Sequence, residues 1–352
     1  MNTKTTIIDV NNLRFFTTEL HGVTRSFKTI PVFSSVKLRV LRGYILYFLL
    51  LLAFFTLSCK TAPKTIGMMP SENSSIPLDA GALGYIFADV QNSRPILESI
   101  NFNGMNNDKQ FQQMLDSTQF AVLATYPPQS PRRYQLVAWG DYPSSRAKMA
   151  LGASKDWKNT RSTVSKNTYW YNEQQRLSIG INPTQAFMLA LKEKSSANAS
   201  LDIPTDPFSA ASGVTVPNGF GTFSKDAVFS CWFENPGPLI NQKIQAMGIP
   251  FELPAERIFI SLFPINEEQQ KEQRYEARLK IQVASETQAR GLATVFNIAR
   301  SFLSLQADSD DVAVFASILF TKAPVLDGKS LNITTAALSG RELALLFRVF
   351  SL

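Results

Sequence analysis

The sequence contains a single histidine, His21. It precedes a predicted export signal, so the processed protein would contain no imidazole at all. Ser-His-Asp and Cys-His nucleophile systems would then lack their base, and zinc or non-haem iron sites would lack their commonest ligand. An enzyme would have to use carboxylates, lysines or serines, and no pair of these has a diagnostic spacing. We therefore predict a protein that is not an enzyme.

Cysteine is nearly as scarce, with only Cys59 and Cys231. If Cys59 is modified, the fold can contain no internal disulfide, so its stability must come from packing. Cys231 lies between Ser230 and Trp232 in a predicted strand. A buried, inert thiol is expected there in preference to a nucleophile.

The positive charge is concentrated at the N-terminus. The whole chain has a formal charge of +7, but residues 1–58 hold seven of its basic side chains and only two of its acidic ones. The remainder is therefore close to neutral, at +2. This distribution gives no reason to expect a nucleic acid partner.

Residues 1–58 resemble a secretion leader. Lys37, Arg39 and Arg42 precede an apolar run over 44–57 that ends at Ser58-Cys59. A basic segment followed by ~7–15 apolar residues and a small residue is typical of a signal peptide, whereas a spanning helix needs ~20 residues. An uncleaved signal anchor is the alternative, and in both cases the remaining chain is exported and attached to a membrane.

Ser58-Cys59 also resembles the lipobox of bacterial lipoproteins. Thr56 and Leu57 depart from the usual pattern, but relaxed boxes of this kind are familiar in spirochaetes. The resemblance implies that Cys59 is acylated, with palmitate or a related chain, and becomes the new N-terminus. Lys60 stands where an inner-membrane retention signal of the enteric type would have Asp, which favours the outer membrane.

Beyond the leader we predict four segments. Residues 59–79 are rich in Pro, Ser, Asn and Thr, which predicts a flexible tether, and residues 195–222 are a connector rich in Ser, Ala, Pro and Gly. The connector separates two repeats, residues 80–194 and 223–352.

The repeat is visible without gaps at the start of each copy. Residues 84–97 (GYIFADVQNSRPIL) align on 227–240 (AVFSCWFENPGPLI), and each copy continues with predicted helices and strands. The common unit is β-α-β-β-α-β-β-α, and Asp327-Gly328 marks a hairpin in the second copy. We therefore predict an α+β fold of two tandem units related by a pseudo-twofold axis, each an antiparallel sheet with helices on one face.

Two short motifs are weak evidence for a ligand. The acidic cluster at Asp308, Asp310 and Asp311 lacks the Gly and Glu that a calcium loop of the EF-hand kind requires. Gly219-Phe220-Gly221 is a fragment of a phosphate-binding pattern and falls in the connector, where we expect a flexible loop. The sequence predicts neither a metal site nor a cofactor.

Two predicted helices have unusually wide apolar faces. On a helical wheel, the apolar residues of 287–305 cover an arc of about 200°, which exceeds the roughly 100° stripe of a surface helix. The last helix starts with Ser339 and Glu342 in capping-box spacing, and its apolar face is wider still. Burial between the sheet and a neighbouring helix is one explanation. The other is contact of part of each face with lipid. The candidate contacts are Leu292, Phe296, Phe302, Leu303, Leu346, Phe347 and Phe350.

The lipobox, the size of the chain and these helices together resemble the treponemal outer-membrane lipoproteins whose amphipathic helices insert into the inner leaflet. This resemblance implies a lipid-anchored protein on the periplasmic leaflet of the outer membrane, with membrane lipid as its partner. The leading hypothesis is a non-enzymatic lipoprotein that binds lipid or perturbs the bilayer. An envelope scaffold that presents a sheet edge or groove to another envelope protein is the alternative.

Overall fold

The computed structural model describes residues 75–99, 112, 115–127, 129–182, 187–193, 205–209, 213–246, 252–265, 273–305, 321–340 and 342–343. The leader, most of the predicted tether and the last nine residues lie outside these ranges, as do several internal segments.

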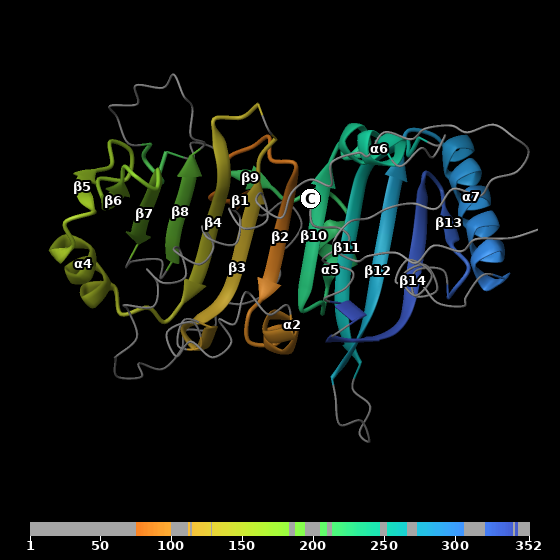
Figure 1. Ribbon diagram of the computed structural model, residues 1–352, viewed down its shortest axis with the longest axis horizontal. Helices are drawn as coiled ribbons and strands as arrows, with labels where there is room; N and C mark the ends of the chain where they lie inside the picture. The colour runs from red at the N-terminus through yellow and green to blue at the C-terminus, as the bar shows by residue number, and fades with distance from the viewer. Residues whose placement is uncertain are drawn as a thin grey trace, which may run out of the picture.

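A single antiparallel sheet of twelve strands dominates the fold (Figure 1). The order across the sheet is β13-β14-β12-β11-β10-β2-β3-β4-β8-β7-β6-β5. The strands are β2 (Gly84–Asp89), β3 (Thr118–Thr125), β4 (Arg132–Gly140), β5 (Lys158–Arg161), β6 (Thr168–Asn172), β7 (Leu177–Asn182), β8 (Phe187–Glu193), β10 (Phe229–Glu234), β11 (Ala255–Ile265), β12 (Arg274–Val283), β13 (Val325–Asp327) and β14 (Ser330–Ser339). The fold is therefore α+β, as the sequence predicts.

Alternating side chains explain why these segments form strands. In β3, buried and partly buried residues alternate along the whole strand. This period of two matches a strand with one face in the core. The predicted hairpin at Asp327-Gly328 is present between β13 and β14, and Gly328 has a positive φ of 56°. Such a backbone conformation favours glycine because a Cβ would be crowded there.

The two aligned segments meet at the centre of the sheet. β2 pairs antiparallel with β10, with Tyr85 opposite Trp232 and Phe87 opposite Ser230. The predicted two sheets are therefore one continuous sheet. The first five elements follow the same order in both halves, but within the described ranges four strands follow α4 in the first half and two follow α7 in the second. The tandem repeat of identical units is thus not established.

The larger helices cover one face of the sheet. They are α2 (Arg94–Ser99), α4 (Ser144–Ala153), α6 (Gly237–Ala246) and α7 (Glu286–Leu305). Ile96 of α2 and Leu151 of α4 belong to one core cluster, and Ile240 of α6 packs against a second that includes α7. Phe229 of β10 belongs to the first cluster and Phe233 of β10 packs against the second. These two side chains are four residues apart and point to the same side of the strand, so the two clusters lie on the same face of the sheet. These four helices therefore lie on the same face of the sheet.

The other face is covered by the start of the domain and by part of the connector. β1 (Ser75–Ile76) pairs with β9 (Val214–Thr215), and the short helix α5 (Phe220–Ser224) follows β9. Phe220 is fully buried among Phe87, Trp232 and Phe259. Gly219-Phe220-Gly221 therefore begins a packed helix, and the expectation of a flexible loop is wrong. The aromatic side chain supplies the burial that holds it in place.

The end of the predicted tether also lies on the sheet. Ile76 and Leu78 are buried against the same aromatic cluster as Phe220. We call residues 75–82 the strap. Residues 75–79 of the predicted tether therefore belong to the packed domain.

The predicted closing helix of the first repeat is a strand. Residues 187–193 form β8, which lies between β4 and β7. Met188, Leu189, Ala190 and Leu191 are all buried, because helices cover one face of the sheet here and the strap and connector cover the other. A short apolar run buried on both sides cannot be distinguished from a buried helix by periodicity. The edge strand β5 was not predicted at all.

Candidate functional site

Helix α7 begins at a capping box. The backbone N–H of Gln288 donates to Ser285 Oγ at 3.2 Å, and the N–H of Ser285 donates to Gln288 Oε1 at 3.2 Å. This reciprocal pair satisfies two backbone donors and fixes where the helix starts. The same arrangement occurs at the predicted capping box of the last helix, where Ser339 and Glu342 exchange hydrogen bonds at 2.7 and 3.3 Å.

One half of the wide apolar face of α7 packs on the sheet. Ala289, Leu292 and Ala293 are buried and Phe296 is partly buried, in the spacing i, i+3, i+4, i+7 of a single helical row. They contact the β12 and β14 side chains Ile281, Val283, Leu331 and Ile333. This row is about as wide as a surface helix needs for docking on one core.

The other half of the face is open to solvent. Val295 is 38% exposed and Ile298 is 51% exposed. At 100° per residue, Val295 lies about 60° and Ile298 about 120° around the helix from Leu292. Ile298 therefore points away from the sheet instead of lying at the rim of the packed row. Burial on two sides does not hold for this part of α7.

The neighbouring edge strand adds two more exposed apolar side chains. β13 contacts α7 and, among the described strands, is the terminal one on this side of the sheet. Val325 is 62% exposed and Leu326 is 44% exposed. We call Val295, Ile298, Val325 and Leu326 the apolar end. Only two other large apolar side chains among the described residues, Met149 and Val164, are exposed to this degree.

The apolar end is an open surface with only a shallow hollow in it. A shallow hollow on α7 is lined by Thr294, Asn297, Ile298 and Ser301, which face solvent. Arg290 and Arg300 are exposed on the same helix and are its only basic residues. Such a surface can contact an extended apolar partner, but it lacks the converging buried polar groups of a small-molecule site.

No helix within the described ranges is long and apolar enough to cross a membrane.

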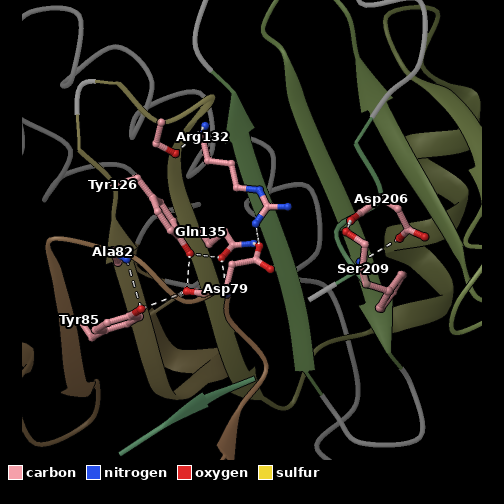
Figure 2. A network of polar contacts seen from close by, with 10 residues as sticks. Asp79, Ala82, Tyr85, Tyr126, Arg132, Gln135, Asp206 and Ser209 are labelled. Carbon is pink, nitrogen blue, oxygen red and sulfur yellow. Dashed lines mark hydrogen bonds and ion pairs between the residues drawn. The ribbon is translucent and has the colours of Figure 1, made fainter. Parts of the chain in front are cut away.

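A cluster of polar side chains fixes the strap to the sheet (Figure 2). The carboxylate of Asp79 pairs with Arg132 and accepts a hydrogen bond from the amide of Gln135, both on β4. The backbone carbonyl of Asp79 accepts the hydroxyls of Tyr85 at 3.0 Å and Tyr126 at 2.9 Å. Because these groups are partly or fully buried, removing one partner would leave the others unsatisfied. The cluster therefore determines where the predicted tether leaves the domain.

Two charged side chains beside this cluster are poorly solvated. Burial raises the pKa of Glu193, although Arg176 and Arg132 lie close enough to oppose the shift. One oxygen of its carboxylate is buried without a hydrogen-bond partner. Burial, together with Arg133 and Arg176, lowers the pKa of Lys192 to about 8. Both side chains belong to β8, and no sequence pattern indicated them because the burial and the arginines come from other segments.

Catalytic and metal chemistry finds little support in the described part of the chain. It contains no group of three or more His, Cys, Asp or Glu side chains that could hold a metal ion. Cys231 is buried in β10, and burial raises the pKa of its thiol to about 12. The predicted burial of this cysteine is confirmed, and a raised thiol pKa disfavours the reactive thiolate.

The candidate lipid contacts are only partly within the described residues. Leu292 is 2% exposed and belongs to the core, so its placement on a lipid-facing surface is corrected. Phe296 packs against the same core cluster. The side chains of Phe302 and Leu303 lie outside the described part, as do Cys59, Leu346, Phe347 and Phe350 entirely. The acidic cluster at 308–311 also lies outside it.

The sequence contained part of the signal for the apolar end. Val295 and Ile298 lie on the wide apolar arc of α7, but the wheel cannot show which half of the arc faces the sheet. Val325 and Leu326 gave no such signal, because only the strand order shows that β13 is an edge.

Comparison with known proteins gives a faint likeness. No family description and no curated relative matches the chain. Among solved structures, crystal form III of TP0453, a treponemal outer-membrane lipoprotein, aligns with 16% identity and a TM-score of 0.49. The alignment covers 78% of this chain and 97% of that one. Crystal form I aligns with 15% identity and a TM-score of 0.46, over 78% and 96% of the two chains. Function is therefore inferred below from this chain's own side chains.

Proposed function

We propose that this chain is a non-enzymatic lipoprotein of the cell envelope, anchored through Cys59, that contacts the bilayer with its apolar end. The observation that supports this most is the division of α7 into a packed row and an exposed apolar row. Exposed apolar side chains cost free energy in water, and gathering four of them at one end favours an apolar partner. Insertion into lipid would bury them.

The position of the strap is compatible with this contact. The strap lies on β2 and β4, and five strand spacings separate β2 from β13, which is about 24 Å. If residues 60–74 form the flexible tether that their composition predicts, sixteen steps from Cys59 to Ser75 span about 22 Å as a coil and at most about 55 Å. A bilayer that holds Cys59 would then be within reach of the apolar end.

Tethering makes a weak contact sufficient. A domain held close to a bilayer meets it at a high effective concentration, so modest apolar burial gives stable association. We place the anchor in the periplasmic leaflet of the outer membrane, on the strength of Lys60 and the lipobox. Membrane lipid is the partner in this proposal.

Flotation with lipid vesicles tests the contact. Residues 60–352 without the acyl chain contain every described element, and they should float with vesicles. The double variant V295S/I298S should bind about 30-fold more weakly, because losing two apolar side chains costs about 2 kcal/mol. The control T294S/N297S changes neighbouring exposed positions of α7 and should bind like the wild type. If the wild-type fragment stays in the aqueous phase at all lipid compositions, the proposal is lost.

The anchor needs a separate measurement. Mass spectrometry of the mature protein should find an N-terminal acylated Cys59. The C59A variant should be recovered without the acyl chain and should lose its detergent partitioning. An unmodified Cys59 inside a longer N-terminal peptide would support an uncleaved signal anchor instead.

A scaffold is the second candidate function. The observation that favours it is β13, a terminal strand whose three residues are all exposed. An edge strand can pair with a strand of another protein. Cross-linking in cells from position 327 should then return one stoichiometric partner, and V325S/L326S should abolish that cross-link, whereas loss of flotation in the same variant would favour lipid contact.

A further inference from the structure

The end of the sheet opposite α7 has a different character. α4, β5 and β6 lie there together, far from α7 in Figure 1. Residues 144–172, which include all three elements, carry six cations and one carboxylate. The other described residues carry fifteen cations and sixteen carboxylates. The surplus charge of the described domain therefore belongs to this segment, which we call the basic end.

Most of these cations are available to solvent. Arg146, Lys155, Lys158, Arg161 and Lys166 are exposed and Lys148 is partly exposed. Lys158 pairs with Glu173 at 2.6 Å, but both side chains are well exposed, so the pair is weak. The basic end thus presents a strong positive potential.

Two exposed apolar side chains lie among the cations. Met149 of α4 is 71% exposed and Val164 is 62% exposed. On α4, Met149 lies about 160° to 200° from the buried Ala147 and Leu151, so it points directly outward. Arg146 lies about 60° from Met149 on the same outward side.

The turn that carries Val164 is held in a fixed shape. Ser162 is buried, and its hydroxyl accepts the N–H groups of Val164 at 3.2 Å and Ser165 at 3.0 Å. Lys166 adopts a positive φ of 61°, and its ammonium donates to the carbonyl of Thr163 at 2.9 Å. These contacts hold Val164 at the tip of the β5–β6 hairpin, next to a cation.

We propose that the basic end binds the headgroup surface of an anionic phospholipid bilayer. Cations supply the attraction to anionic headgroups, and outward apolar side chains among them match the interfacial layer, which a soluble polyanion would not use. This surface is distinct from the apolar end, since eleven strand spacings, about 50 Å, separate β5 from β13. The proposal therefore goes beyond the contact made by α7.

The experiment uses the full chain held in nanodiscs of phosphatidylcholine, so that the membrane carrying the protein has no anionic lipid. Fluorescent nanodiscs are mixed with separate vesicles of one of two compositions. The neutral vesicles contain phosphatidylcholine alone, and the anionic vesicles contain about 30 mol% phosphatidylglycerol, which is enough for a strong negative surface potential. Co-flotation measures capture. We expect capture by the anionic vesicles only, with loss at high salt, because salt screens the attraction.

Charge reversal at the basic end tests whether capture depends on this surface or on the net charge of the protein. R146E/K148E/K155E should weaken capture by about 100-fold or more, since each basic residue near an anionic surface contributes about fivefold. The first of these changes places Glu in the first turn of α4, where a carboxylate is favourable, so unfolding is not expected. K225E/K322E/K329E makes the same change in net charge at exposed lysines elsewhere and should retain capture. Circular dichroism checks that both variants fold.

A further variant distinguishes a bilayer from a soluble polyanion. M149S/V164S should weaken capture severalfold with all charges intact, and dextran sulfate should compete poorly. Equal losses in the two charge-reversal variants would overturn the proposal, as would capture of neutral vesicles or no capture by the wild type. Tight binding of dextran sulfate with no effect of M149S/V164S would also overturn it, in favour of an anionic polymer. V295S/I298S should leave this capture unchanged, which separates the result from that of the apolar end.

Discussion

Both ends of the sheet expose apolar side chains, four at the apolar end and two at the basic end, but in different electrostatic settings. At the apolar end, Val295 and Ile298 are accompanied on α7 by only two basic residues. At the basic end, Met149 and Val164 lie among six cations. The first surface can bind only by burying apolar area, whereas the second can attract an anionic surface at a distance. The two proposed contacts would therefore respond to different conditions.

The largest expected effect tests the division of α7 into two halves. L292A should lower the free energy of unfolding by about 3 kcal/mol, because it leaves a cavity under the helix. I298A should change it by less than about 0.5 kcal/mol, since the side chain is exposed. Urea unfolding of residues 60–352 measures both. Equal destabilisation by the two variants would show that Ile298 is packed, and the distinction between the two halves would fail.

The next effect concerns the strap that lies between the two ends. D79A should destabilise the domain by about 2 kcal/mol, because Arg132 and Gln135 lose a partly buried carboxylate partner. D89A removes a partly exposed carboxylate at the end of β2, which accepts hydrogen bonds only from Asn92 among the described contacts, and should have a smaller effect. Hydrogen exchange should show faster exchange at Ile76 and Leu78 in D79A alone. Unchanged protection there would mean that packing and not the polar cluster holds the strap.

Ionic strength should separate the two surfaces. Raising salt from 0.1 to 0.5 M shortens the screening length from about 10 Å to about 4 Å. Capture by the basic end should fall at least tenfold, whereas flotation of the 60–352 fragment with neutral vesicles should hold or increase. A parallel loss in both assays would show that charge, and not apolar area, governs both contacts.

The smallest effect depends on pH. Burial lowers the pKa of Lys192 to about 8, below its ordinary value, so between pH 8 and 10 the unfolded chain binds a proton that the folded chain does not. Stability should therefore rise with pH in this window, by less than the 1.4 kcal/mol per pH unit that one proton allows. K192M should lack this rise when the two proteins are compared by thermal unfolding. An identical pH profile would show that Lys192 keeps its ordinary pKa.

The sequence predicted the local elements well where one face of a strand or helix is buried. β3 and α7 each have a single core-facing side, so the period of two and the period of 3.6 are visible in their sequences. It misjudged β8, where both faces are buried, and the tip of the connector, where Phe220 is packed by residues far away in the chain. In these cases the decisive partners lie on other strands, and local periodicity does not contain them.

The sequence by itself determined the scarcity of histidine and cysteine, the α+β class and the wide apolar arc of α7. These are properties of composition or of a single segment, so they need no partner. Only the tertiary structure decided which half of that arc is free, that β13 is an edge, and that the surplus cations gather at the opposite end. The physical reason is that exposure and potential depend on strand order across the sheet, and that order is set by pairings between segments distant in the chain.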